Sequence, residues 1–438
     1  MITPAYDFSQ DEVILYKGES QIVNDGICYD GIAEIKFVFL PKSQIIIDAK
    51  FEGSKAADFI DYDEGVTLFI LENKVDIFII ESMIEPTPPI KSLLKCVPKI
   101  NGIPILLDNT KKAKKVVSHI FNFYNFQDWN KKIDLDNGGF RISETTLETR
   151  NYDIVIQSMR ETSKHIEMIK KDGKSRLTQV VKIEKKDGGF VSIEEYKKLQ
   201  ELLKYFFSFT KGSWITLTCA TGLDYDNKQV WHLFNDPKSE WKSLSSWFDP
   251  TRELNMIALK KLFSLFSKIW ESENWRETLA EVIYWFINAN DGEGGVDTGL
   301  ILAQTALERL SFEYVVNDKK LLSGKGFKDI WASDKFRLLF SSLSVPLGIP
   351  SELTTLAKEA KNHNWLDSPH ALTEIRNSLV HPEHKKHGKF NIDVYIEAHT
   401  LSLWYLEVSI LAICKYDGLY SNRVNRGDVE NVPYLDVE

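Results

Sequence analysis

The sequence predicts a multidomain α+β protein, in which a β-rich region, sandwich-like or barrel-like, is followed by an all-α helical bundle. Over the first two hundred residues, short Val-, Ile- and Phe-rich runs alternate with polar turn clusters, which is typical of strands. After the glycine-rich break Asp291–Gly295, apolar residues recur at helical spacing. A chain of 438 residues also exceeds what one core organises. We therefore expect a β-rich domain over 1–205, an aromatic-rich connecting region becoming helical over 206–290, and a helical domain over 291–438.

The N-terminal region is expected to contain strands and two helices. Gly-containing turns should supply the positive φ of tight hairpins. A helix is expected at Lys111–Phe123, with its lysines exposed. A second helix is expected at Ser192–Phe207, where Ser192 caps the first turn and Glu194 and Glu195 complement the helix dipole. The expected strands are Ala33–Leu40, Ser43–Phe51, Val66–Leu71 and Lys74–Ile80, and the turns are Asp136–Gly139, Lys171–Gly173 and Asp187–Gly189.

The second half should be helical. Seven of the eleven tryptophans lie between Trp214 and Trp285, and we expect them to fill cores and interfaces rather than to stack on bases. Ser368 is the expected N-cap of one helix, with Pro369 at its first position, and Pro382 should end that helix at His381. The expected helices lie within Thr251–Asn288 and at Thr298–Val316, Phe327–Leu343, Ser351–Asn362, Ser368–His381 and Ile392–Tyr416.

Composition limits the possible partners and compartment. The formal charge of −9 and the pI near 5.6 exclude a general polycation, so contact with nucleic acid should be local. The four cysteines form no Cys-x-x-Cys pair, which favours a reduced cytoplasm. The beginning of the sequence lacks the basic flank and apolar run of a secretory signal. The longest apolar stretch, Val394–Tyr416, carries Glu397, His399 and Glu407, so we expect a buried helix and no membrane span.

A group of polar side chains rims the apolar face of the helix expected at Ser368–His381. Leu372, Ile375 and Leu379 share one stripe, which should face the core. Asn377 and His381 share a neighbouring face, and Arg376 flanks the stripe from the other side. A pocket would form most easily where this rim meets a second surface, such as the same helix of a partner protomer. We therefore expect a homodimer.

The run Arg376–Pro382 resembles the Arg-x(4–6)-His motif of HEPN domains, in the form in which Asn follows Arg. Together with Ala306–Leu310 on an earlier helix, it is similar to the ApeA-like HEPN branch. The segments Phe206–Trp214 and Ser246–Asp249 resemble the N-terminal region of ApeA-type proteins. The resemblance covers about half of the chain.

This resemblance implies a homodimeric, metal-independent endoribonuclease that needs no cofactor. It also implies a role in antiphage defence through abortive infection, or as a toxin, with the N-terminal domain as regulator and a phage-derived trigger. His381 would move protons, because its ordinary pKa lies near neutrality. Arg376 would bind the phosphate, Asn377 would orient His381 or the phosphate, and Glu308 would hold Arg376 or His381.

Alternative interpretations stay open. The same helix could carry only a solvated polar face, or the domain could be a catalytically silent HEPN scaffold that dimerises and binds RNA or a partner protein. Residues 1–205 could bind a carbohydrate or another small ligand that defines the function. Gly324-Lys325-Gly326 lacks the glycine spacing of a P-loop, so ATP-driven action is not expected.

The histidines after the motif helix, His381, His384 and His387, have a spacing that can suggest a metal site. No cysteine or paired carboxylate completes such a site, so we expect none. The lysines among them, Lys385, Lys386 and Lys389, favour a basic surface that contacts RNA phosphates.

Overall fold

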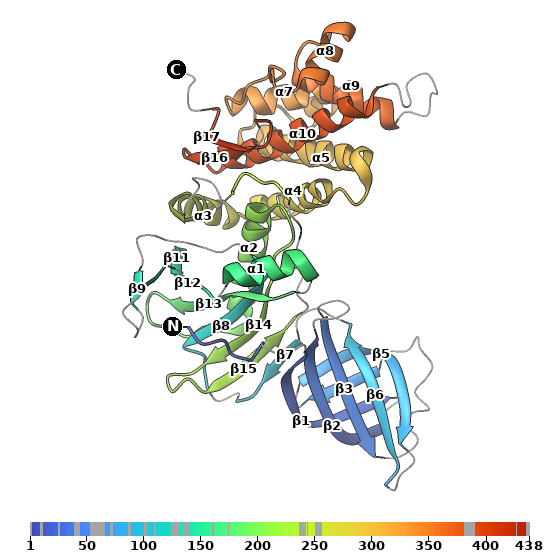
Figure 1. Ribbon diagram of the computed structural model, residues 1–438, viewed down its shortest axis with the longest axis vertical. Coiled ribbons are helices and arrows are strands. Elements are labelled where there is room, and N and C mark those ends of the chain that lie inside the picture. The colour runs from blue at the N-terminus through green and yellow to red at the C-terminus, as the bar shows by residue number, and fades with distance from the viewer. Residues whose placement is uncertain are drawn as a thin grey trace. The chain divides into compact units, whose positions relative to one another are not determined.

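The protein consists of two compact units in the computed structural model (Figure 1). Unit 1 comprises Met1–Leu203 and Ile215–Trp241, and unit 2 comprises Lys204–Trp214 and Lys242–Glu438. Unit 1 is β-rich and unit 2 is helical, so the expected α+β multidomain organisation is confirmed. The structure describes residues 2–8, 12–24, 27–38, 44–52, 66–70, 73–85, 89–99, 103–108, 111–123, 132–134, 140–142, 144–159, 162–173, 175–235, 242, 244–249, 256–380, 390–425 and 427–434.

A closed six-stranded barrel begins unit 1, with strand order β1-β2-β3-β6-β5-β4 and antiparallel neighbours throughout. Inward side chains such as Ile35, Phe37, Ile47 and Phe51 are fully buried. The four strands expected here are confirmed, and of the two expected architectures the chain adopts the barrel. Its strands are β1 (Glu12–Asn24), β2 (Ile27–Val38), β3 (Gln44–Glu52), β4 (Val66–Ile70), β5 (Asn73–Glu85) and β6 (Lys91–Pro98).

A seven-stranded antiparallel sheet follows, in the order β11-β12-β13-β8-β14-β15-β7. Its core is continuous with that of the barrel, since Phe37 and Phe121 stack with ring centroids 5.2 Å apart. The strands are β7 (Ile103–Leu106), β8 (Lys115–Phe121), β11 (Glu144–Glu148), β12 (Tyr152–Ser158), β13 (Leu177–Lys185), β14 (Leu217–Leu223) and β15 (Gln229–Phe234). A separate pair, β9 (Lys132–Asp134) and β10 (Phe140–Ile142), flanks the expected turn Asp136–Gly139, which lies outside the described residues.

The prediction of a helix at Lys111–Phe123 is wrong. This segment contains the strand β8, which pairs with β13 on one side and β14 on the other. Residues 116–121 are all buried, because a central strand is covered on both faces, whereas an amphipathic helix would expose one face.

Two helices accompany this sheet. Helix α2 (Ile193–Lys211) begins as expected: Ser192 Oγ accepts the amide of Glu195 at 3.2 Å, and Glu195 Oε2 accepts the amide of Ser192 at 2.9 Å. Helix α1 (Thr162–Asp172) was not expected, because it is short, strongly charged and carries few apolar residues. Gly173 does adopt a positive φ of 71°, but it ends this helix and does not form a hairpin.

The segment expected to connect two domains, residues 206–290, is divided between the units. Strands β14 and β15 complete the sheet of unit 1, and helices α3 (Met256–Trp270) and α4 (Glu273–Asp291) belong to unit 2. Trp231, Trp247 and Trp270 are buried, as expected for core side chains.

Two buried histidines fix the N-terminal residues against the sheet of unit 1. The amide of Ala5 donates to His119 Nε2 at 3.0 Å, so His119 carries its proton on Nδ1, which donates to the carbonyl of Cys219 at 3.1 Å. The hydroxyl of Tyr6 lies 2.6 Å from His232 Nδ1. Burial lowers the pKa of both histidines to about 4, so both rings are neutral in the folded protein.

Acid should therefore destabilise unit 1. The unfolded chain binds protons at these rings near pH 6.5 and the folded chain only near pH 4, so the free energy of unfolding should fall as pH drops through this window. The expected loss between about pH 7 and about pH 4.5 is about 2 kcal/mol for each ring. Urea unfolding followed by circular dichroism, at about pH 7 and about pH 4.5, measures it. His119→Gln should have a flatter pH dependence than the parent, and an equal slope in the two proteins would contradict this account.

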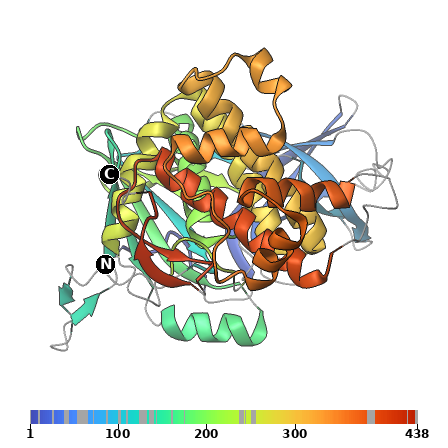
Figure 2. The same ribbon diagram turned by 90° about the horizontal axis from the view of Figure 1, so that it is seen from above.

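Unit 2 is built around helix α10 (Ile392–Ile413), which packs against α4, α5, α8 and α9. Figures 1 and 2 show these helices, coloured yellow to red, from two directions. In the described part of the chain, α10 is the one helix long and apolar enough to cross a membrane, but most of it is buried, as expected for a core helix. The other elements are α5 (Gly295–Phe312), a π-helix (Glu313–Asp318), α6 (Gly324–Asp329), α7 (Ala332–Ser342), α8 (Thr354–His363), α9 (Ser368–Val380) and the hairpin β16 (Leu419–Asn422) and β17 (Asp428–Asn431).

These helices follow the expected ones closely, with two differences. The last four residues of the helix expected at Thr298–Val316 belong to the π-helix, since α5 ends at Phe312. The single helix expected at Phe327–Leu343 is interrupted, because Ile330 and Trp331 adopt extended backbone between α6 and α7. The expected break at Asp291–Gly295 is a tight turn between α4 and α5, in which Gly292 has a φ of 72°.

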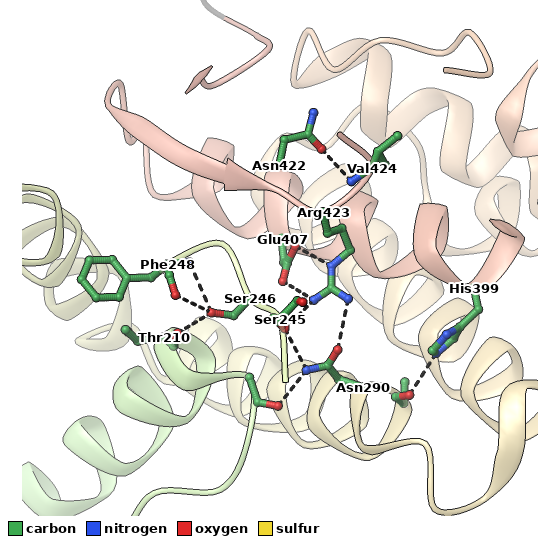
Figure 3. A network of polar contacts seen from close by, with 12 residues as sticks. Thr210, Ser245, Ser246, Phe248, Asn290, His399, Glu407, Asn422, Arg423 and Val424 are labelled. Atoms are coloured by element: carbon green, nitrogen blue, oxygen red, sulfur yellow. Dashed lines mark hydrogen bonds and ion pairs between the residues drawn. The ribbon is translucent and has the colours of Figure 1, made fainter. Parts of the chain in front are cut away.

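A buried ion pair holds the end of unit 2 together (Figure 3). Glu407 of α10 has no exposed surface and accepts from Arg423 Nε at 2.9 Å and Nη2 at 2.6 Å. Arg423 also donates to Asn290 Oδ1 and to the carbonyl of Ser245. Asn290 in turn donates to the carbonyls of Gly212 and Ser245. One guanidinium thus joins α10 and the β16–β17 turn to α4 and to two loop segments.

Candidate functional site

Helix α9 carries the Arg-Asn motif, and its first turn is held by an ionic cap. Asp367 Oδ1 accepts the amide of His370 at 2.9 Å, while both Asp367 carboxylate oxygens bind Arg337, at 2.6 and 2.9 Å. Asp367 is therefore the N-cap, and the assignment of that role to Ser368 is wrong. Ser368 lies inside the helix and donates to the carbonyl of Gly348, because an aspartate with two partners caps the helix one residue earlier.

The buried face of α9 packs on α5. Leu372 and Ile375 are fully buried, and Gln304 Nε2 of α5 donates to the carbonyl of Leu372 at 2.6 Å. Leu379 is only half-buried, so the expected apolar stripe is confirmed for its first two members. Arg376 and Asn377 are half-buried, as expected for side chains at the rim of this face.

Arg376 differs from the other arginines of unit 2 that the structure describes. Neither Arg376 nor Asn377 forms a side-chain hydrogen bond or ion pair with any described residue. The other four described arginines of this unit each contact a carboxylate: Arg276 contacts Glu273, Arg309 contacts Glu281 and Glu313, Arg337 contacts Asp334 and Asp367, and Arg423 contacts Glu407. With respect to the residues that the structure describes, the donors of the Arg376 guanidinium are thus available for an external anion.

The other residues predicted for the site either lie outside the described residues or contact a different part of unit 2. Helix α9 ends at Val380, and His381, Lys385, Lys386 and Lys389 lie outside the described residues. The carboxylate of Glu308 binds Lys335 Nζ of α7 at 2.5 Å. Among the described residues, no hydrogen bond or ion pair joins Glu308 to Arg376.

A cluster of aromatic side chains that no sequence motif indicated lies beside the end of α9. The hydroxyl of Ser378, two residues after Arg376, lies 3.3 Å from that of Tyr395. The Phe390 ring lies edge-on to Tyr395, with centroids 6.1 Å apart, and also to Trp365 at 5.6 Å. The members come from α10 and two loops, so no local pattern predicts their contact.

The hydrogen-bond donors of this site, on Arg376 and Asn377, determine which ligands it can bind. A planar guanidinium on a helix rim can bind two phosphate oxygens at once, and an amide beside it can donate to the same anion. In the part of the chain that the structure describes, no three His, Cys, Asp or Glu side chains are grouped closely enough to hold a metal ion.

Comparison with known proteins gives the following relationships. Residues 108–243, from the loop before β8 to the segment after β15, match the YopA central domain. Residues 272–433, from α4 through β17, match the YopA C-terminal domain. The chain is similar to YopA over nearly its whole length. It is 26% identical to the SPbeta prophage-derived uncharacterized protein YopA of Bacillus subtilis (strain 168) over 433 residues, which cover 98% of this chain and 95% of the relative. No solved structure matches the chain.

Proposed function

We propose that unit 2 is a metal-independent endoribonuclease domain of the HEPN type, active as a cytoplasmic homodimer and regulated by unit 1. The observation that carries the proposal is the guanidinium of Arg376 on the rim of α9, which has no hydrogen-bond or ion-pair partner among the described residues, whereas the other described arginines of this unit contact carboxylates. An arginine whose guanidinium has no carboxylate partner in the described part of the chain is suited to bind the phosphate of an RNA substrate.

The proposed reaction is an attack of the ribose 2′-oxygen on the adjacent phosphorus. The bond from phosphorus to the 5′-oxygen breaks, so the products are a 2′,3′-cyclic phosphate and a 5′-hydroxyl. His381 takes the proton of the 2′-hydroxyl or gives one to the leaving 5′-oxygen. Arg376 stabilises the charge on the non-bridging oxygens in the transition state, and Asn377 orients the phosphate.

The proposed homodimer brings two copies of the motif together. Val380 at the end of α9 and Ile392 and Ile396 at the start of α10 are exposed apolar side chains on either side of the motif segment. A second copy would cover them, which favours association at this face. The prophage origin of the YopA relative supports a role in conflict between phage and host, through abortive infection or toxicity.

A silent HEPN scaffold that binds RNA or a partner protein is the second candidate. The pairing of Glu308 with Lys335 favours it, because the carboxylate expected to orient Arg376 or His381 has another partner. Cleavage assays separate the two candidates, since a scaffold would bind without cutting.

A chelator and a modified substrate test the proposal. Purified full-length protein should cut RNA equally well with and without a chelator, because Arg376 supplies the positive charge that a metal would otherwise bring. The products should carry the cyclic phosphate, and a 2′-O-methyl group at the cut site should block cleavage. Light scattering of the same samples reports the oligomeric state. Activity that disappears with the chelator, or cleavage of the methylated site, would reject this chemistry.

A further inference from the structure

Three segments of unit 1 form a locally basic end of its seven-stranded sheet. The first is residues 111–115, a lysine-rich run that was expected to lie on a helix but instead leads into β8. The second is the turn before α2, residues 186–190, and the third is the turn between β14 and β15, residues 224–228. Together they carry six lysines and three aspartates, whereas the whole chain has a net charge of −9. This end of the sheet therefore attracts anions that the rest of the chain repels.

Hydrogen bonds hold the three segments together. Ala113 forms a bridge with Val191, whose amide donates to the Ala113 carbonyl at 2.9 Å. The amide of Lys114 donates to the carbonyl of Leu223 at 2.6 Å, and the Lys114 ammonium donates to the carbonyl of Gly188. The side chains of these segments are thus presented by a backbone whose position is fixed from both sides.

Two exposed aromatic rings lie among these lysines. Tyr225 is 67% exposed and Phe190 is 38% exposed, and their ring centroids lie 5.7 Å apart in an edge-on arrangement. Lys114 Nζ lies 5.1 Å from the centroid of Tyr225, and Lys112 Nζ lies 5.9 Å from that of Phe190. Exposed rings next to ammonium groups are the combination that binds single-stranded nucleic acids, because bases stack on the rings and phosphates bind the ammonium groups.

The lysines of this end differ in how carboxylates neutralise them. Lys111 lies 3.8 Å from Asp108 and 3.6 Å from Asp224, so its charge is compensated. Lys112 and Lys114 form no ion pair with a carboxylate of any residue that the structure describes. The two ammonium groups next to the rings are therefore the ones that can bind an external anion.

We propose that single-stranded RNA binds at the Tyr225 surface, which consists of Tyr225, Phe190, Lys112 and Lys114. Bases stack on the two rings, and the two ammonium groups bind the phosphates between them. The choice of RNA rests on the proposed function, and this surface gives unit 1 a part in holding the substrate. A double helix fits less well, because its bases are already stacked on one another. An acidic peptide would use the lysines but not the rings.

Fluorescence anisotropy of the full-length protein with a labelled, single-stranded 2′-O-methyl RNA tests the proposal. The methyl groups block the proposed cleavage reaction, so binding is measured independently of whether the protein cuts RNA. The protein should bind this probe, and the affinity should fall as salt rises, because bound phosphates release counterions. Unlabelled duplex RNA and poly-glutamate should compete less well than the unlabelled single strand. Absence of binding, or equal competition by either competitor, would overturn the proposal.

Three variants locate the binding. Tyr225→Ala should weaken it about tenfold, because one stacking ring is lost. Tyr225→Phe should bind as the parent does, since the ring and not the hydroxyl contacts the base. Lys112→Gln should weaken binding and flatten its salt dependence, because one phosphate contact is lost. Parent-like affinity in Tyr225→Ala, or an equal loss in Tyr225→Phe, would overturn the proposal.

Phe78→Ala is the matched control. Phe78 of β5, also in unit 1, is 50% exposed, and Lys99 Nζ lies 4.7 Å from its ring centroid. It reproduces one exposed ring beside one lysine, but no second aromatic ring lies against it among the described residues. The affinity of this variant should stay at the parent value. A loss as large as that of Tyr225→Ala would show that binding is not specific to the Tyr225 surface and would overturn the proposal.

Discussion

Replacing Arg376 with alanine is expected to lower the rate of RNA cleavage by a factor of about 10² to 10⁴. Folding should be nearly unaffected, because the Arg376 side chain is half-buried and forms no hydrogen bond or ion pair with a described residue. His381→Ala should have a similar effect on the rate, since it removes the proton-transfer group. Asn377→Ala should lower the rate less, because the Asn377 side chain only orients the reacting groups.

Single-turnover cleavage of a labelled RNA, together with thermal melting of each variant, measures these effects. Arg276→Ala is a matched control: it removes an equal charge from unit 2, and the one ion pair of Arg276 with a described residue is a long contact of 3.7 Å with the exposed Glu273. It should cut RNA at the parent rate. If Arg376→Ala or His381→Ala retains the parent rate, the motif does not catalyse the reaction.

Arg423→Ala should be the most destabilising single change considered, lowering the free energy of unfolding by about 3 to 5 kcal/mol. It leaves the wholly buried carboxylate of Glu407 without a counter-ion. Asn290 Oδ1 and the carbonyl of Ser245 also lose the hydrogen bonds that Arg423 donates to them. Urea unfolding near neutral pH measures this loss. Lys261→Ala is the control, because it breaks an exposed ion pair with Asp417 and should cost less than about 1 kcal/mol.

The pH dependence of the Arg423→Ala protein provides a second test of the same network. Burial raises the pKa of Glu407, and the charge of Arg423 opposes this rise. Without Arg423 the folded state should bind a proton at Glu407 more readily than the unfolded state. The loss of stability should therefore be smaller at acidic than at alkaline pH, relative to the parent protein. A loss that is independent of pH would show that Glu407 is not the source of the destabilisation.

Local sequence patterns predicted much of the fold. The barrel strands have alternating or continuous apolar runs, and the capping box of Ser192 and Glu195 marks the start of α2. The helices of unit 2 carry their apolar residues at helical spacing, and Gly292 ends α4. These features depend on residues within a few positions of one another, so they can be recognised without knowledge of distant contacts.

The candidate site was predicted only in part. The sequence located Arg376 and Asn377 on the rim of a buried helix face, because the spacing of Leu372 and Ile375 defines that face. It could not predict that Asp367 and not Ser368 would cap the helix, because Asp367 is held by Arg337 from α7. It also could not predict the pairing of Glu308 with Lys335, which are 27 positions apart.

The sequence by itself determined the β-rich and helical parts of the chain and the segment that carries the Arg-Asn motif. Tertiary structure decided that Val116–Phe121 is a central strand, that Glu308 pairs with Lys335, and that Arg376 has no carboxylate partner among the described residues. The physical reason is that periodicity and capping are local properties of the chain. Burial on two faces, ion pairing and cavities depend instead on which distant segments come together, and a single sequence does not reveal those contacts.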